Sequence, residues 1–129
     1  MLTGQYTSID DFDVNDFRRS IPRFSKENFG KNLQLVEVLK GIADKKGCTS
    51  GQLTLAWLMC QGPDIFPIPG TKKVNYLEEN VGAMGVRLTE EEERVIREAV
   101  EGAEVWGTRV AETLMRGLVM DTPELRGGD

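Results

Sequence analysis

The residues best suited to chemistry form one short run, Pro69, Gly70, Thr71, Lys72 and Lys73, between an apolar segment and a helical pattern. Glycine lets a ligand approach the backbone, and threonine supplies a hydroxyl. Two lysines add positive charge at the amino end of a helix, where free amides attract anions. The run therefore predicts a site for a phosphate-sized anion. The same residues also suit a solvated turn that caps a helix, and they match neither the GxxxxGKS/T nor the GxGxxG phosphate-binding pattern.

Other catalytic chemistry is restricted by what the 129-residue chain lacks. It contains no histidine, the commonest general base near neutral pH, so Ser-His-Asp and Cys-His nucleophiles are excluded within it. Cys48 and Cys60 are twelve residues apart and provide too few ligands for zinc. We therefore expect no metal site, and we expect both cysteines to be small, buried or half-buried apolar residues.

Composition and charge are typical of one soluble globular domain. The chain has 40% hydrophobic and 29% charged residues and a formal net charge of -5. Nucleic-acid binding depends largely on lysine and arginine, so this acidic balance disfavours it. No apolar run reaches the roughly 20 residues that cross a bilayer, and the amino terminus lacks the pattern of a secretory signal. The expected location is cytoplasmic, with no membrane or nucleic-acid partner.

Apolar spacing predicts two helices in the first half of the chain. Apolar residues three and four apart indicate one amphipathic helix over residues 32–46, which ends at a glycine. A second helix begins at a capping box, in which the side chains of Thr49 and Gln52 each bond the other's backbone amide. Its apolar stripe is so wide that we expect it to be covered on most sides, with Trp57 and Cys60 in the core.

The second half of the chain combines one strand with further helices. Residues 64–68 are a short apolar run between prolines, which predicts a strand buried on both faces. Helices are expected over residues 73–81, with Leu77 directed inward, and after a second capping box at Thr89 and Glu92. A lone strand has no hydrogen-bond partner, so part of the sheet should lie outside this chain. Less regular pieces are expected at the ends: a helical turn over 13–19, a short helix over 110–119 and a frayed tail over 121–129.

The stretch around the anion-binding run resembles the NADP-binding signature near the carboxyl end of aldo-keto reductases. Residues 68–80, followed by Val81, Gly82 and Ala83, carry the most specific part of this resemblance. The resemblance covers nearly all of residues 1–129, through segments at 2–4, 49–58, 88–90, 107–109 and 121–123. It implies an α/β fold, a (β/α)8 TIM barrel of which this chain is the mostly helical carboxyl-terminal half, because a complete barrel takes roughly 250 residues.

The resemblance implies NADP(H) as the cofactor and assigns its contacts to six positions. Three match residues that hold the 2′-phosphate of the cofactor: Gly70, Thr71 and Lys72. Two match residues that hydrogen-bond the adenine: Glu79 and Asn80. The sixth, Tyr76, falls where relatives often carry arginine. It keeps a face for stacking on the adenine and loses a charge, so the preference for NADP should depend more heavily on Lys72, with Lys73 as a second candidate.

The catalytic groups of the family do not carry over to this chain. The resemblance implies hydride transfer between NADPH and an aldehyde or ketone, with a tyrosine acid, a lysine, an aspartate and usually a histidine in the amino-terminal half. Tyr6 and Tyr76 are the only tyrosines here, and neither lies in a matching motif. Trp106 either borders the cofactor or packs in the terminal segment. Two interpretations remain open: the cofactor-binding part of a reductase, or a non-catalytic module that associates with a reductase, a complementary half-barrel or itself.

Overall fold

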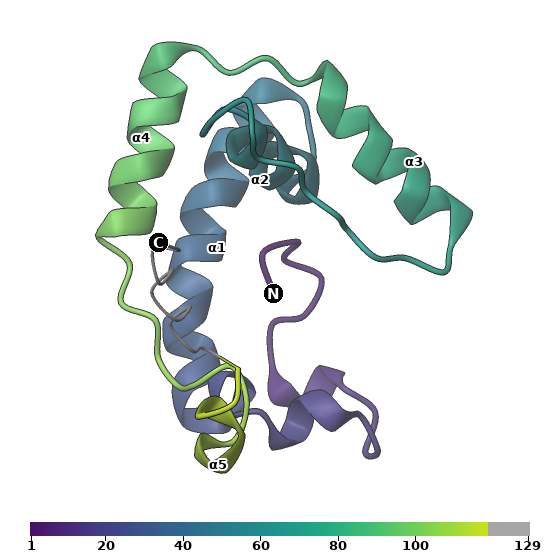
Figure 1. The fold of residues 1–129 in the computed structure, drawn as a ribbon, viewed down its shortest axis with the longest axis vertical. Helices are drawn as coiled ribbons and strands as arrows, with labels where there is room; N and C mark the ends of the chain where they lie inside the picture. The colour runs from purple at the N-terminus through teal and green to yellow at the C-terminus, as the bar shows by residue number, and fades with distance from the viewer. Residues whose placement is uncertain (119–129) are drawn as a thin grey trace, which may run out of the picture.

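Helices and short turns make up residues 1–118, the part of the chain that the computed structural model describes (Figure 1). The long helix α1 (Lys26–Lys46) packs against α2 (Ser50–Met59) and α4 (Glu90–Glu101). Helix α3 (Val74–Gly82) contacts α2 and extends away from the other helices, and α5 (Glu112–Met115) is a single turn. The 3-10 turns span Ile9–Asp11, Phe17–Ser20, Pro22–Phe24 and Ala83–Gly85. The tail predicted over 121–129 lies outside the described residues.

The ends of α1 follow from its capping residues. It begins at Lys26, earlier than the expected residue 32, because Ser25 caps it: the Ser25 hydroxyl accepts a hydrogen bond from the amide of Asn28 at 3.3 Å. It ends at Gly47 as predicted, with a left-handed φ of 73° that glycine adopts without strain. The helix predicted over 110–119 is shorter, since only Glu112–Met115 is helical among the described residues.

Both predicted capping boxes are formed. Thr49 Oγ1 accepts from the amide of Gln52 at 3.1 Å, and Gln52 Oε1 accepts from the amide of Thr49 at 3.1 Å. Thr89 and Glu92 make the same pair of bonds at the start of α4, at 3.2 and 2.8 Å. Each cap contributes about 0.5–2 kcal/mol to helix stability, so these boxes fix where α2 and α4 begin.

A small core lies where α1, α2 and α4 meet. Its fully buried side chains are Leu39, Ala43, Leu53 and Ile96. Trp57 packs half-buried against them, as predicted for a core residue, and its indole N–H has no hydrogen-bond partner among the described residues. Beside the core, Lys46 Nζ lies 2.6 Å from Glu92 Oε2, and this bond lowers the pKa of the Glu92 carboxyl. The end of α1 is thereby tied to the start of α4.

The prediction of a strand over residues 64–68 is wrong for the described part of the chain. Residues 64–68 are not in a strand, and residues 1–118 contain none. Phe66 is 79% and Ile68 is 93% exposed, where burial on both faces was expected. A strand needs a neighbour for its backbone N–H and C=O groups, and the described residues offer no such neighbour. The described part is therefore all-helical, and the sheet of the expected half-barrel is not formed by these residues.

Two expectations about side-chain burial are also wrong. Leu77 was expected to face inward but is 53% exposed on α3, because α3 packs against α2 alone among the long helices. Cys60 was expected in the core but is exposed, as is Met59, at the end of α2. The rest of α2 is buried or half-buried, as predicted for a helix covered on most sides. Cys48 is half-buried, as expected, and burial raises the pKa of its thiol. None of the described helices is long and apolar enough to span a bilayer.

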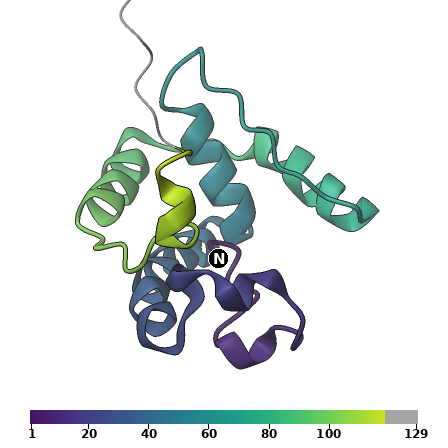
Figure 2. The ribbon, with the colours of Figure 1, turned by 60° about the horizontal axis from the view of Figure 1, so that its bottom comes forward.

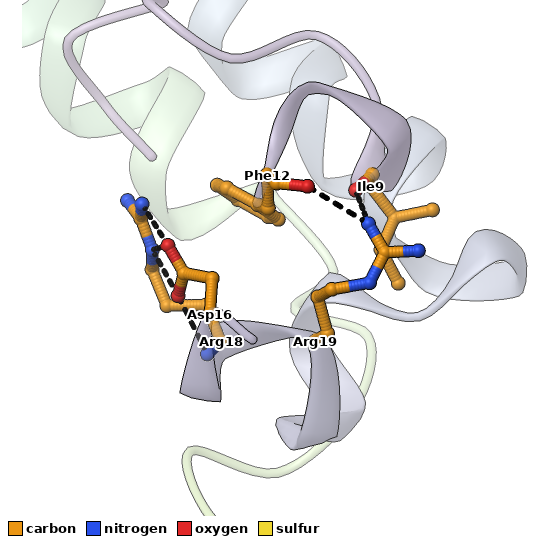
Figure 3. Close-up of polar contacts among 5 residues, drawn as sticks. All are labelled: Ile9, Phe12, Asp16, Arg18 and Arg19. Atoms are coloured by element: carbon orange, nitrogen blue, oxygen red, sulfur yellow. Dashed lines mark hydrogen bonds and ion pairs between the residues drawn. The ribbon is translucent and has the colours of Figure 1, made fainter. Parts of the chain in front are cut away.

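Arginine contacts order the segment that precedes α1 (Figure 3). The Arg18 guanidinium lies 4.3 Å from the centroid of the Phe12 ring and donates from Nε to Asp16 Oδ1 at 2.9 Å. The hydrogen bonds that Asp16 accepts from the side chain and the backbone amide of Arg18 lower its pKa to about 2. Arg19 Nη1 donates to the backbone oxygens of Ile9 and Phe12, at 2.7 and 3.0 Å. A segment of short 3-10 turns is thus held in one arrangement by side-chain donors.

Asn32 joins this segment to the residues that follow α4. Its Nδ2 donates to the backbone oxygens of Arg23 at 3.0 Å and Trp106 at 2.8 Å, and its Oδ1 accepts from the amide of Trp106 at 2.8 Å. The next residue, Gly107, has a φ of 81°, and a Cβ there would lie 2.7 Å from backbone atoms of Pro22. The structure therefore fixes the backbone of Trp106, while the residue is 36% exposed and the centroid of its ring lies 4.0 Å from Lys31 Nζ.

Replacing Asn32 by leucine should lower the free energy of unfolding by about 2–3 kcal/mol, because it leaves three backbone groups without their partner in a buried place. Urea unfolding followed by circular dichroism measures the change. Asn28→Ala is the matched control on the same helix, since Asn28 makes one such side-chain bond, from Nδ2 to the oxygen of Pro22 at 3.0 Å. Equal losses for the two variants would contradict the role given to Asn32.

Candidate functional site

Five of the six predicted cofactor-binding residues line one cleft. The cleft has a volume of about 620 Å³ and is bordered by the start of the chain, the first turn of α2, the segment before α3 and α3 itself. The five predicted residues that line it are Gly70, Thr71, Tyr76, Glu79 and Asn80. The sixth, Lys72, is exposed next to this lining. The cleft also contains Pro69, from the predicted anion-binding run, and three residues that were assigned no role from the sequence: Thr3, Gln5 and Gly51.

The path of the chain brings these residues together. From the end of α2 the chain runs outward to a tip, and α3 then turns back toward α2 (Figures 1 and 2). The amino end of α3 therefore lies at the tip, while Glu79 and Asn80 on its last turns lie close to α2. This path places Thr71 and the carboxylate of Glu79 in the lining of the same cleft.

The amino end of α3 is open, unlike those of the other long helices. Ser25, Thr49 and Thr89 cap α1, α2 and α4 with their side chains, whereas Lys73 supplies no side-chain cap to α3. The turn itself is fixed, because Thr71 Oγ1 accepts from the amide of Lys73 at 3.2 Å. First-turn amides without a cap carry the positive end of the helix dipole, so this end is suited to an anion.

The amino end of α3 is surrounded by two lysines, a glycine whose backbone is accessible and the ring of a tyrosine. Lys72 and Lys73 are exposed, and Lys73 Nζ lies 5.5 Å from the centroid of the Tyr76 ring. A Cβ at Gly70 would meet nothing within 4 Å, so a ligand can approach the backbone there. Tyr76 is half-buried and contributes its ring to the cleft. The arrangement can hold a phosphate that is joined to a flat ring.

The other end of the cleft is built by the capping box of α2. Thr49 Oγ1 donates to Glu79 Oε1 at 2.6 Å, and Gln52 Nε2 donates to the backbone oxygen of Glu79 at 3.2 Å. Two glycines permit this close approach: a Cβ at Gly82 would lie 2.5 Å from Gln52 Nε2, and one at Gly51 would lie 3.3 Å from Glu79 Oε1. Helix α3 is therefore docked on α2 by side chains that also cap α2.

Sequence reasoning missed Thr3, Gln5 and Gly51 as residues of the cleft. Gly51 gave a usable signal, because glycine inside a helix is unfavourable and often marks a close approach of another group. Thr3 lies 48 residues before Gly51 in the sequence, and its Cγ2 would be 3.7 Å from a Cβ at that glycine. No local pattern could indicate that pairing. No group of three or more metal-ligating side chains was found among the described residues.

Comparison with known proteins identifies the family to which this chain is related. Residues 1–101 match the model of the Aldo/keto reductase family. The chain belongs to the aldo-keto reductase family. The resemblance inferred from the signature residues is thereby confirmed at the level of the family.

Two curated aldo-keto reductases are similar over nearly the whole chain. Aldo-keto reductase str7 of Strobilurus tenacellus is 54% identical over 125 residues, which cover 97% of this chain and 37% of that protein. Aldo-keto reductase yakc of Schizosaccharomyces pombe, whose name specifies NADP(+), is 53% identical over 124 residues, covering 96% of this chain and 36% of the relative. Probable aldo-keto reductase 1 of Glycine max is 42% identical over 101 residues, covering 78% and 29%. The chain spans about a third of the length of these relatives.

Proposed function

We propose that this chain provides the part of an NADP-dependent aldo-keto reductase that holds the adenosine 2′-phosphate end of the cofactor. The observation that carries the proposal is the cleft in which Gly70, Thr71, Tyr76, Glu79 and Asn80 meet beside an uncapped helix end. The name of the fission yeast relative supports NADP(H) over NAD(H). Membership in the family supports hydride transfer between NADPH and an aldehyde or ketone as the reaction of the whole enzyme.

Each residue has a role that fits its position in the cleft. The first-turn amides of α3 and the Lys72 ammonium are donors for the 2′-phosphate. The Thr71 hydroxyl becomes a further donor when its proton turns from the backbone oxygen of Lys73, to which it donates at 3.3 Å, toward the phosphate. The Tyr76 ring offers a stacking face for the adenine. Glu79 and Asn80 supply the polar groups for the adenine edge. When bound, NADPH supplies the hydride. This chain's residues bind and orient the adenosine end, and the chemistry of reduction requires groups that these residues do not include.

An exposed apolar surface on α3 supports a partner for this chain. The side chains of one face of α3, and of the segment that runs beside it in Figures 1 and 2, are well exposed. We name them the α3 surface: Phe66, Ile68, Val74, Leu77 and Val81. Large contiguous apolar patches are rare on soluble monomers and mark interaction sites. The relatives extend well beyond the matched region, so we propose that a complementary portion of a reductase barrel covers this surface. Self-association of a non-catalytic module is the second candidate.

The proposed function predicts preferential binding of 2′-phosphorylated adenosine. Isothermal calorimetry on the 129-residue chain should give a dissociation constant for 2′,5′-ADP about tenfold or more below that for 5′-AMP, because a charge-assisted phosphate contact contributes roughly 1.5–3 kcal/mol. The two ligands share the adenine and the 5′-phosphate, so their difference reports the 2′-phosphate alone. Equal affinities, or no binding of either ligand, would reject the proposed function.

A further inference from the structure

We propose that Thr49 is a positioning residue for the adenine contact: its hydroxyl holds one oxygen of the Glu79 carboxylate and leaves the other for an amino group of the base. The inference rests on the proposed function, because it assumes that the cleft receives the adenine. It adds a residue outside the signature. Thr49 is the N-cap residue of α2, 30 residues before Glu79 in the sequence, and does not itself line the cleft.

The Thr49 hydroxyl makes two hydrogen bonds, and only one assignment of donor and acceptor fits both of them. Its oxygen accepts from the amide of Gln52 at 3.1 Å, so the single proton is free to point elsewhere. That proton is donated to Glu79 Oε1 at 2.6 Å. A hydrogen bond to a carboxylate is shorter and stronger than one between neutral groups. The capping of α2 and the orientation of Glu79 are thus set by the same atom.

The surroundings of Glu79 hold the rest of the residue in place. Gln52 Nε2 donates to its backbone oxygen at 3.2 Å, which fixes the turn of α3 from which the carboxylate extends. Gly51 lines the cleft beside the pair, and a Cβ there would lie 3.3 Å from Glu79 Oε1 and 3.6 Å from Thr49 Oγ1. With the backbone fixed by Gln52, the remaining freedom of Glu79 is rotation of its side chain. The Thr49 hydroxyl removes that freedom.

A fixed carboxylate discriminates between purines. An ionised carboxylate only accepts hydrogen bonds, so it favours the exocyclic amino group of adenine. Hypoxanthine carries a carbonyl oxygen at the same place, which leaves the carboxylate unpaired and repels it. The ratio of adenine to hypoxanthine affinity therefore reports the orientation of Glu79. Changes that affect the phosphate or the helix in general alter both affinities together and cancel in this ratio.

The test measures this ratio with 2′,5′-ADP and inosine 2′,5′-bisphosphate by calorimetry on the whole 129-residue chain. Thr49→Asp keeps a good helix cap but cannot donate, and its charge repels Glu79. We expect it to lose about fivefold or more of the adenine preference of the unaltered chain. Thr49→Gly, a neutral change that costs the cap little, should lose a similar share. Thr49→Ser keeps the donor and should preserve the preference.

Thr89→Asp is the matched control. It makes the same substitution in the same motif, where the Thr89 hydroxyl donates to Glu92 at 3.1 Å, away from the cleft. It should leave the adenine preference unchanged. If the unaltered chain prefers adenine and both Thr49→Asp and Thr49→Gly keep that preference, the inference is overturned while the proposed function stands. If the unaltered chain does not bind 2′,5′-ADP, the proposed function itself fails. If Thr49→Asp does not fold, Thr49→Gly decides.

Discussion

The purified 129-residue chain, given NADPH and a reactive aldehyde, will reduce no carbonyl above the uncatalysed background. Hydride addition leaves an alkoxide that must be protonated as it forms, and a positioned proton donor contributes roughly 10² to 10⁴-fold. The chain has no histidine, and its tyrosines are engaged elsewhere. The Tyr6 ring lies 4.7 Å from that of Phe12, and Tyr76 lines the cleft beside α3. The measurement is the loss of NADPH absorbance.

Adding the amino-terminal portion of a related reductase should restore turnover. That portion brings the tyrosine and lysine that the family resemblance assigns to catalysis, and it offers a partner for the α3 surface. Two controls are needed: the amino-terminal portion alone, and the same portion mixed with a chain that carries Leu77→Glu, a charge in the middle of the α3 surface. Both should stay inactive. Turnover by the chain alone that is abolished by Tyr6→Phe or Tyr76→Phe would contradict the prediction and reveal a different site.

The helices could be predicted because their signals are local. The capping boxes at Thr49 and Thr89 are each formed by residues three apart, and the glycine that ends α1 acts within one turn. The strand over 64–68 failed for the opposite reason. A strand is stabilised by a neighbour that can be far away in the sequence, and apolar content alone does not supply one. The prediction that Leu77 is buried failed for the same reason, since an apolar position on a helix becomes buried only when another element covers it.

The candidate site also combines residues that the sequence could predict with a contact that it could not. The run from Gly70 to Lys73 showed by its residue types that an anion could bind, and left a solvated turn as an alternative. The resemblance supplied the adenine residues, and five of the six positions that it indicated line one cleft. What neither could supply is the contact between Thr49 and Glu79. It depends on how α3 returns along α2, and this path is set by the fit of Gly82 against Gln52 rather than by a pattern in either helix.

Replacing Lys72 by glutamate should weaken NADPH binding by about tenfold to a hundredfold, and NADH binding by much less. In the proposed function the ammonium pairs with the 2′-phosphate, which only NADPH carries, and a well-formed charge pair of this kind contributes roughly 1.5–3 kcal/mol. We expect Lys72 to carry more of this preference than in relatives with arginine, because the proposed stacking by Tyr76 brings no charge. Titration by cofactor fluorescence, with the barrel completed by the amino-terminal portion, measures both dissociation constants.

Lys40→Glu provides the control for net charge, because Lys40 is exposed in the middle of α1 and outside the cleft. It should change the affinities for NADPH and NADH equally and only slightly. The loss caused by Lys72→Glu should also shrink as salt is raised, since both Lys72 and the phosphate that it meets remain near water and are screened within a Debye length of about 8 Å at physiological ionic strength. Equal losses of NADPH and NADH affinity in Lys72→Glu would refute the role of Lys72 and with it the assignment of the open end of α3 to the 2′-phosphate.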